Sequence, residues 1–158
     1  MRELILLRHA HAAEAIAGQA DIDRPLSPEG LAEAEAAAAW LAQQNLIPDR
    51  VLCSPSRRTR ETMDAVLAQV GYVDQRLEDG IYEGTSGTLA GLADANREAE
   101  RLLLVGHNPG LEQLAALMHS GQSGDYRGMP PGGIAVLTLP ADAGIEPGVA
   151  RLSAFWWP

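Results

Sequence analysis

Apolar residues along the chain gather into short segments, separated by longer stretches in which they recur every three or four positions. The short segments predict β-strands, because strands covered on both faces consist of nearly unbroken apolar runs. We expect five strands, over residues 3–7, 50–53, 102–105, 134–139 and 151–156. The longer stretches have helical spacing and predict helices.

Four helices are expected between these strands. Ser27-Pro28 predicts the start of the first, since a hydroxyl N-cap followed by proline commonly begins a helix. Ser54-Pro55 repeats this signal for the second helix, and Asn108-Pro109 opens the fourth. A third helix is expected over residues 85–97. The expected buried side of the first helix consists of Leu31, Ala34, Ala38 and Leu41.

The alternation of strands and helices predicts an α/β protein. We expect a three-layer α/β/α sandwich, in which a mainly parallel central sheet has helices on both faces. Residues 1–158 are interpreted as a single domain, and the glycine- and proline-rich segment 121–133 as a long surface loop. In such sheets ligands bind beyond the carboxyl ends of the strands. Residues that directly follow strands are therefore the candidates for a functional site.

Composition and charge narrow the class of protein. The chain has 158 residues and a formal net charge of −9, which argues against nucleic acid or an anionic membrane as its partner. Its single cysteine, Cys53, rules out an internal disulfide and favours a reducing compartment, the cytoplasm. The apolar run that Arg8 interrupts is too short for the core of a signal peptide or for a membrane span.

Arginine and histidine follow three of the predicted strands. Arg8 and His9 come after the first, Arg57 and Arg58 after the second, and His107 after the strand over 102–105. Two of these strand ends open directly into helices, whose free N–H groups and partial positive charge favour phosphate. Arginines that bind phosphate oxygens beside a histidine that can act as a nucleophile suit phosphoryl transfer.

Three sequence blocks stand in order at these strand ends: Arg8-His9-Ala10, Ser-Pro-Ser-Arg-Arg-Thr-Arg-Glu-Thr over 54–62, and Gly-His-Asn-Pro over 106–109. Together they resemble the Arg-His-Gly, Ser-Pro-x-x-Arg-Ala-x-x-Thr and Gly-His-x-Pro blocks of the histidine phosphatase superfamily, which includes the cofactor-dependent phosphoglycerate mutases. The short chain and segment 23–30 are most similar to the small bacterial phosphohistidine phosphatases. Ala10 departs from the family's glycine, so its loop must keep a negative φ or carry slight strain.

This resemblance implies a role for each site residue. His9 attacks phosphorus and holds the phosphoryl group, while a backbone carbonyl orients its second ring nitrogen. The register of the second block selects Arg58, not Arg57, as the phosphate ligand. Arg8 and Arg58 then hold the phosphate oxygens, and a protonated His107 donates to them. No metal and no other cofactor is implied, because these side chains supply the positive charge.

A general acid is a further requirement for phosphate esters, whose leaving alkoxide needs a proton. Larger family members use a glutamate after the second helix, for which Glu83 is the nearest candidate here and Glu78 the other. The resemblance to the small phosphohistidine phosphatases implies that this general acid is absent. We therefore favour a second interpretation, in which the Glu83 charge supports the helix that begins near Thr85.

Arg24 and Asn108 are additional candidates for substrate binding. Arg24 can reach the site from the long loop, or it can form a salt bridge with Asp21 or Asp23. We expect a metal-independent phosphatase that acts through His9 on phosphohistidine in a protein partner. The alternatives are a phosphomonoesterase or mutase for small phosphate esters, and a non-catalytic phosphate-binding module. The partner is thus a phosphorylated protein or a small phosphate-bearing substrate.

Two other chemistries are weaker interpretations. His9-x-His11 is similar to the metal-binding histidine pair of amidohydrolases, but that fold is a barrel of about 250 residues, which this chain cannot supply. Cys53 ends a strand, as the nucleophile of a cysteine phosphatase does, but that family has arginine six positions later, where this chain has Thr59. Cys53 is instead expected to be a buried thiol.

Overall fold

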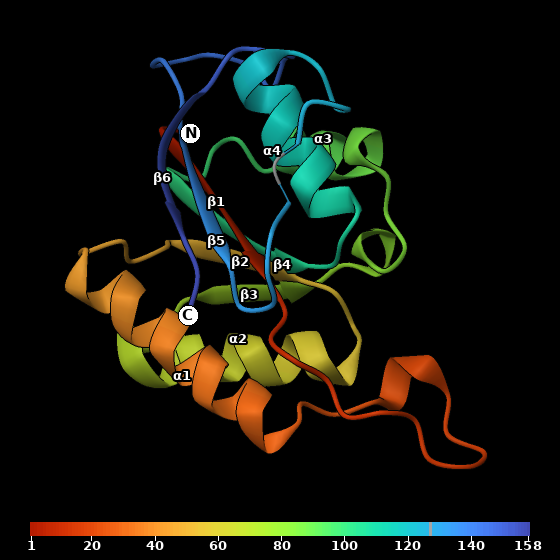
Figure 1. Ribbon diagram of the computed structural model, residues 1–158. Helices are drawn as coiled ribbons and strands as arrows, with labels where there is room; N and C mark the ends of the chain where they lie inside the picture. Colours follow the sequence, from red (N-terminus) through yellow and green to blue (C-terminus); the bar gives the residue numbers. More distant parts are fainter. Residues whose placement is uncertain (127) are drawn as a thin grey trace.

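The computed structural model describes residues 1–126 and 128–158. Within these ranges six strands form one sheet in the order β3-β2-β4-β1-β5-β6 (Figure 1). The strands are β1 (Glu3–Arg8), β2 (Arg50–Cys53), β3 (Asp74–Leu77), β4 (Arg101–Gly106), β5 (Ile134–Thr138) and β6 (Arg151–Trp156). The helices are α1 (Pro28–Gln43), α2 (Arg57–Val70), α3 (Ser86–Ala95) and α4 (Gly110–Ser120), with short 3-10 turns η1 (Asp21–Asp23) and η2 (Asp79–Ile81).

Most of the sheet is parallel, as the sequence predicts. The pairs β3–β2, β2–β4 and β4–β1 are parallel, whereas β5 pairs antiparallel with both β1 and β6. The carboxyl ends of β1, β2 and β4 therefore meet at one edge of the sheet. Strand β3 is the element that the apolar pattern did not predict. It is an edge strand whose sequence, Asp-Gln-Arg-Leu, is mainly polar and exposed.

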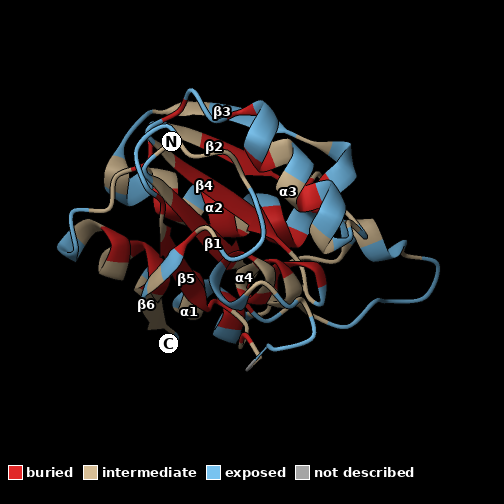
Figure 2. Cartoon of the chain, turned by 90° about the horizontal axis from the view of Figure 1, so that it is seen from above, coloured by how far each residue is buried: buried red, intermediate tan, exposed pale blue. Residues whose placement is uncertain are grey.

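Helices cover both faces of the sheet, with α1 and α2 on one side and α3 and α4 on the other (Figure 1). Successive β1 residues alternate between these layers. Ile5 and Leu7 pack in a cluster with residues of α1 and α2, whereas Leu4 and Leu6 pack with residues of α3 and α4. All four are fully buried, so each stabilises the fold by about 1.5–3 kcal/mol. Figure 2 shows the buried sheet between more exposed helices.

The first residue of α1 agrees with the sequence prediction, whereas those of α2 and α4 differ from it. The Ser27 side chain caps α1 by accepting a hydrogen bond from the Gly30 amide. Helix α2 begins two residues later than predicted, because Ser56 rather than Ser54 is its N-cap. Helix α4 begins at Gly110 and has Pro109 as its N-cap, with no side-chain cap hydrogen bond.

Two other predictions concern the surface. The prediction that Leu31 belongs to the buried side of α1 was wrong, since this residue is 46% exposed. The predicted loop over 121–133 contains Arg127, which lies outside the described residues; its remaining residues form neither helix nor strand. Among the described helices, none combines the length and apolar character that crossing a membrane requires.

Candidate active site

Arg8, His9, Arg58 and His107 line one cavity of about 400 Å³. Arg8 is the last residue of β1, and His9 follows it. Arg58 lies in the first turn of α2, and His107 directly follows β4. The parallel edge of the sheet thus brings together residues up to 99 positions apart in the chain. A second cavity of about 320 Å³, beside α4 and β6, is lined by none of these four.

The His9 ring is fixed by its own backbone neighbour. Its Nδ1 lies 2.7 Å from the carbonyl oxygen of Ala10, so Nδ1 bears the proton and donates it to that oxygen. Burial, with smaller contributions from the nearby cationic groups, lowers the pKa of His9 to about 3. The ring is therefore neutral at pH 7, and the lone pair on Nε2 is available.

Ala10 accommodates its departure from glycine without strain. It is not among the non-glycine residues with positive φ, so its backbone has an ordinary conformation. Its side chain is fully buried and packs with Leu26 and Ala34. The methyl group thus fills a small apolar cluster beneath the loop that follows β1.

Arg8 contributes a partly buried cation to the lining of the cavity. Its Nη1 donates to the Met129 carbonyl oxygen at 2.8 Å, while its buried Nε has no partner among the described residues. Burial lowers the pKa of Arg8, and the carboxylates of Glu112 and Glu33 oppose this effect. Guanidinium remains charged in proteins at every ordinary pH, so a buried unpartnered donor here favours an anionic ligand.

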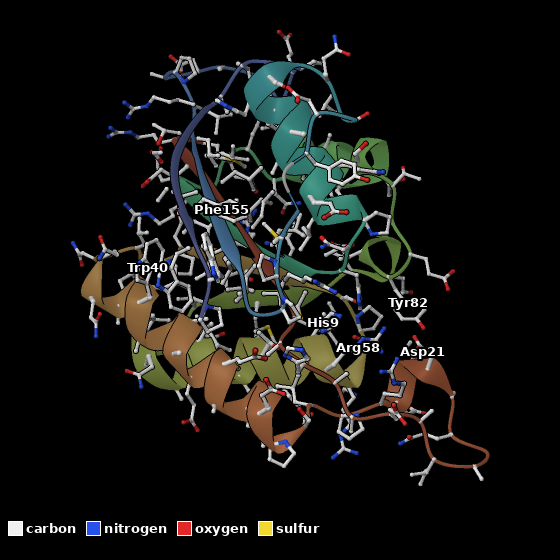
Figure 3. The ribbon with its side chains drawn as sticks, viewed as in Figure 1. His9, Asp21, Trp40, Arg58, Tyr82 and Phe155 are labelled. Carbon is white, nitrogen blue, oxygen red and sulfur yellow. The ribbon has the colours of Figure 1, made fainter. Side chains whose placement is uncertain are left out.

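Arg58 is held by the loop between β1 and α1. It is 7% exposed; its Nη1 donates to the Asp21 backbone carbonyl at 2.8 Å and its Nη2 to Asp21 Oδ2 at 3.0 Å. The guanidinium carbon also lies 5.9 Å from the centre of the Tyr82 ring, within cation–π distance. Figure 3 shows His9, Arg58, Tyr82 and Asp21 on the same side of the molecule.

His107 completes the group of cationic and imidazole side chains. Its Nε2 lies 2.8 Å from Ser54 Oγ, and its ring makes edge contacts with the rings of His9 and Tyr82. Burial, then the charge of Arg58, lowers the pKa of His107 to about 4. The ring is thus neutral at pH 7, whereas the sequence prediction concerns His107 beside a bound phosphoryl group and stays a prediction. Protonation requires a further negative charge nearby, such as a phosphoryl dianion.

The remaining predicted residues differ in their placement. Asn108 lines the cavity, but its Nδ2 donates to the Met129 carbonyl and to Glu112 Oε2, which fixes the segment before α4. Arg24 is not among the described residues that line the cavity. It donates to the Ala13 carbonyl oxygen and, at 2.9 Å, to Asp21 Oδ1. The predicted salt bridge of Arg24 with Asp21 is therefore present, and its role in substrate binding stays a prediction.

Glu83 lies at the cavity in an unusual backbone conformation. Its φ is 59°, in the left-handed region, and it is exposed. Helix α3 begins at Ser86 and has no acidic residue in its first turn, so the interpretation of Glu83 as a first-turn charge was wrong. A Cβ on Gly110 would lie 2.4 Å from the Gly84 carbonyl oxygen. Glycine therefore lets α4 approach this segment closely enough for both to line the cavity.

Sequence reasoning missed Asp21, Tyr82 and Ser54 as parts of this site. Asp21 was considered only as a partner for Arg24, because nothing in the local sequence indicates that it also meets Arg58. Tyr82 has no motif of its own, although it precedes the candidate acid Glu83. Ser54 was assigned to helix capping, whereas the structure pairs its hydroxyl with His107.

The two weaker interpretations find no support in the geometry. Cys53 is fully buried, and burial raises the pKa of its thiol to about 12, so it is not a thiolate nucleophile. His11 is exposed, with its Nδ1 2.8 Å from Glu33 Oε1. It forms a group with Glu29 and Glu33 whose ligand atoms lie within 4.8 Å of one another, and His9 does not belong to this group.

We expect the protein to lose stability as the pH falls from about 6.5 toward 4. The folded-state pKa values of His9 and His107 lie below the ordinary value of 6.5, so the unfolded chain binds more protons in this window. The free energy of unfolding therefore rises with pH up to about 6.5, and above that pH the two histidines no longer change it. Each histidine contributes about 1–2 kcal/mol of this rise between pH 5 and 7. Urea unfolding of His107→Gln should show a weaker pH dependence than the native protein; equal dependence would contradict this origin.

Comparison with known proteins agrees with the site. A family model for the histidine phosphatase superfamily, branch 1, matches residues 4–128. A curated relative, an uncharacterised protein of Mycobacterium tuberculosis, is 36% identical over 164 residues, which cover 96% of this chain and 99% of the relative.

Solved structures are similar along nearly the whole chain. One from Agrobacterium tumefaciens, provisionally named phosphohistidine phosphatase SixA, is 34% identical with a TM-score of 0.85, and the match covers 99% of this chain and 98% of that one. The protein histidine phosphatase SixA complexed with tungstate is 25% identical with a TM-score of 0.84, covering 99% and 97%. Since the family model spans most of the sequence and these relatives match almost end to end, the chain belongs to the histidine phosphatase superfamily, branch 1.

Proposed function

We propose that this protein is a phosphatase that moves the phosphoryl group of a phosphohistidine in a partner protein onto His9 and then to water. The observation that supports it is the neutral His9 ring, whose Nδ1 donates to Ala10, on a cavity lined also by two guanidinium groups. A nucleophile needs an available lone pair, and this tautomer leaves one on Nε2. The guanidinium groups supply the charge that a phosphoryl group requires.

In the first step His9 Nε2 forms a bond to phosphorus while the bond from phosphorus to the substrate nitrogen breaks. The electron pair of the broken bond remains on that nitrogen. A substrate imidazole that is protonated on its other nitrogen therefore leaves as a neutral ring. The proton on His9 Nδ1 stays in place, and its bond to the Ala10 carbonyl becomes stronger as the ring acquires positive charge.

In the second step a water oxygen attacks phosphorus and the bond to His9 Nε2 breaks. The electron pair returns to Nε2, which restores the neutral ring, and the water protons leave with the product as dihydrogen phosphate. Arg8 and Arg58 hold the non-bridging oxygens in both steps, since phosphoryl transfer depends mainly on positioning and charge. A bound phosphoryl dianion raises the pKa of His107, which then donates to the same oxygens.

A protein substrate is favoured by the surroundings of the cavity. The segment between β1 and α1 projects away from the rest of the molecule and is largely exposed (Figures 1 and 2). The Asp21 side chain of this segment lines the cavity and is 52% exposed, so a side chain of a second protein can reach the cavity. Two of the similar structures also have names that refer to histidine phosphatases.

Activity should survive exhaustive chelation, because the proposed steps use only side-chain charge. Turnover after dialysis against a chelator is expected to remain within about twofold of the untreated value, a change too small for loss of a catalytic Lewis acid. Loss of turnover, with recovery after addition of Mg²⁺ or Zn²⁺, would contradict the proposal. His11→Ala, which removes a member of the exposed group with Glu29 and Glu33, serves as a control for incidental metal binding.

A phosphomonoesterase is the second candidate function, and the position of Glu83 at the cavity favours it. A carboxyl group there could protonate an ester oxygen. Turnover of a phosphohistidine protein and of a panel of phosphate esters, measured side by side, tests the two functions. We expect the phosphohistidine protein to be the better substrate by kcat/KM.

Glu83→Gln distinguishes the two functions further. In the proposed function no enzymic acid is needed, so phosphohistidine turnover should change by no more than about threefold. An alkyl phosphate, whose leaving group is poor, would lose about 10²–10⁴ in kcat if Glu83 were its general acid. That ester-selective loss, in a protein that prefers esters, would move the assignment to the second function.

A further inference from the structure

We propose that the Asp21 carboxylate determines specificity at this cavity, by accepting an N–H hydrogen bond from the leaving group and so selecting phosphoryl groups bound to a nitrogen base. The inference rests on the proposed function and concerns the same site. It assigns a role to a residue that none of the three sequence blocks contains.

The Asp21 carboxylate accepts hydrogen bonds from three side chains. Its Oδ2 accepts from Arg58 Nη2 at 3.0 Å and from the Tyr82 hydroxyl, and its Oδ1 accepts from Arg24 Nη1 at 2.9 Å. The three donors fix the carboxylate at the cavity that Asp21 itself lines (Figure 3). Two carboxylate oxygens can accept about four hydrogen bonds, so these three contacts leave capacity for one more. The side chain is 52% exposed, so a ligand in the cavity can reach it.

The same contacts keep Asp21 ionised. The Tyr82 hydroxyl, then Arg24 and Arg58, hold the pKa of this carboxyl far below its usual range. Asp21 is therefore a carboxylate near neutral pH, where it can accept a hydrogen bond but has no proton to donate. It is of no use to an alkoxide, which requires a proton in order to leave. It suits a leaving group that brings its own N–H.

An imidazole bound to phosphorus is such a group. The P–N bond breaks readily only when the far ring nitrogen is protonated, because the ring then leaves neutral rather than as an anion. A carboxylate beside that nitrogen favours its protonated form. Asp21 would thus hold the proton on the leaving ring through the first transfer step, while Arg8 and Arg58 hold the phosphoryl oxygens.

The charge pattern also disfavours other phosphate compounds. Two guanidinium groups line the cavity, and Asp21 and Glu83 add carboxylates to the same lining. A small phosphate ester that has its own carboxylate would meet like charges there, and specificity commonly depends on such repulsion. A phosphorylated nitrogen base instead presents a dianionic phosphoryl group to the two guanidinium groups and an N–H donor to Asp21.

Asp21→Asn tests the inference, with Asp23→Asn as the matched control. Asp23 is exposed on the same turn, its change alters net charge equally, and it is not among the described residues that line the cavity. We expect Asp21→Asn to lower kcat/KM for a phosphohistidine peptide by about 10- to 150-fold, the range for a lost charge-assisted hydrogen bond. Any shift of Arg58 affects p-nitrophenyl phosphate equally, so turnover of the peptide should fall about tenfold or more relative to this ester, whose leaving group needs no N–H acceptor.

The pH dependence of peptide turnover provides a second test, because a purely structural role of Asp21 would not alter it. Turnover of the peptide should decline on the alkaline side as its ring loses the proton, and in Asp21→Asn this decline should begin at lower pH. Asp21→Glu, which keeps the charge, should recover part of the preference for the peptide. An equal loss on both substrates, or an unchanged pH profile, would overturn the inference, since Asp21 would then serve only to position Arg58.

These outcomes separate the inference from the proposed function. If the native protein hydrolyses the aryl ester through His9 but leaves the phosphohistidine peptide intact, the proposed function fails and the role of Asp21 fails with it. If the native protein hydrolyses both and Asp21→Asn loses both equally, only the role of Asp21 fails.

Discussion

His9→Ala should reduce turnover by about 10⁴-fold or more, the order of loss that follows removal of a nucleophile from an enzyme with a covalent intermediate. Its affinity for inorganic phosphate or tungstate should remain within about threefold, because phosphate binding depends on Arg8 and Arg58, which the change leaves in place. Steady-state assays and isothermal titration calorimetry measure the two quantities separately. Loss of activity with retained anion binding is the pattern expected for a nucleophile.

His11→Ala provides the matched control, since it removes an imidazole two residues away. The His11 ring is exposed and bonds to Glu33 rather than lining the cavity, so its loss should leave turnover within about twofold. If both variants lost activity to the same extent, the His9-x-His11 metal pair would become the better explanation. Undiminished turnover in His9→Ala would exclude the covalent route.

Arg58→Ala should weaken anion binding more than any other single change at the cavity apart from Arg8→Ala. Charge-assisted hydrogen bonds contribute about 1.5–3 kcal/mol, so Kd for phosphate should rise by about 10- to 150-fold. The change also leaves Asp21 without the guanidinium that accompanies it at the cavity, and its negative charge then opposes the anion. Calorimetry with inorganic phosphate measures the effect directly.

The neighbouring Arg57→Ala is the control for this prediction. Arg57 is half-exposed and lies 3.7 Å from Glu61 on the same helix, a pair of the kind that contributes little to stability. Phosphate affinity should therefore change by less than about twofold. Equal losses in the two variants would show that general positive charge, rather than the placement of Arg58, binds the anion.

The sequence predicted the layers of this fold because its strands have unmistakable patterns. Leu4 to Leu7 and Leu102 to Val105 are unbroken apolar runs, and the structure buries each of these residues completely. Strand β3 could not be predicted in this way, since an edge strand with the sequence Asp-Gln-Arg-Leu buries little and is maintained by backbone pairing with β2. Apolar patterns indicate burial, and they miss strands that are stabilised by hydrogen bonds alone.

The sequence did not identify the N-cap of α2, because two serines precede this helix. Ser54 and Ser56 both follow β2, and either could cap α2 by sequence. The structure uses Ser56, whose Oγ accepts from the Thr59 amide, and leaves the Ser54 hydroxyl to meet His107. The choice depends on a residue 53 positions away, and no window of local sequence contains it.

The site residues also differ in whether the sequence could predict them. Arg8, His9, Arg58 and His107 could be placed together because each follows a strand of one parallel sheet. Asp21 could not, since it lies in the short 3-10 turn of the long connection between β1 and α1 and meets Arg58 across 37 residues. Nothing in the pattern of a loop predicts where it folds back. The contacts that we expect to set specificity are therefore those that sequence alone does not reveal.

Formation of phospho-His9 during turnover can be observed directly by rapid acid-free quenching followed by mass spectrometry. The native protein, mixed with a phosphohistidine peptide, denatured in alkali within the first turnover and digested with trypsin, should yield a peptide over residues 9–50 that is heavier by one phosphoryl group on His9. The modification should disappear in acid, survive alkali and be absent from His9→Ala. A phosphoryl group on another residue, or complete single-turnover hydrolysis with no modified protein at any time, would contradict the account.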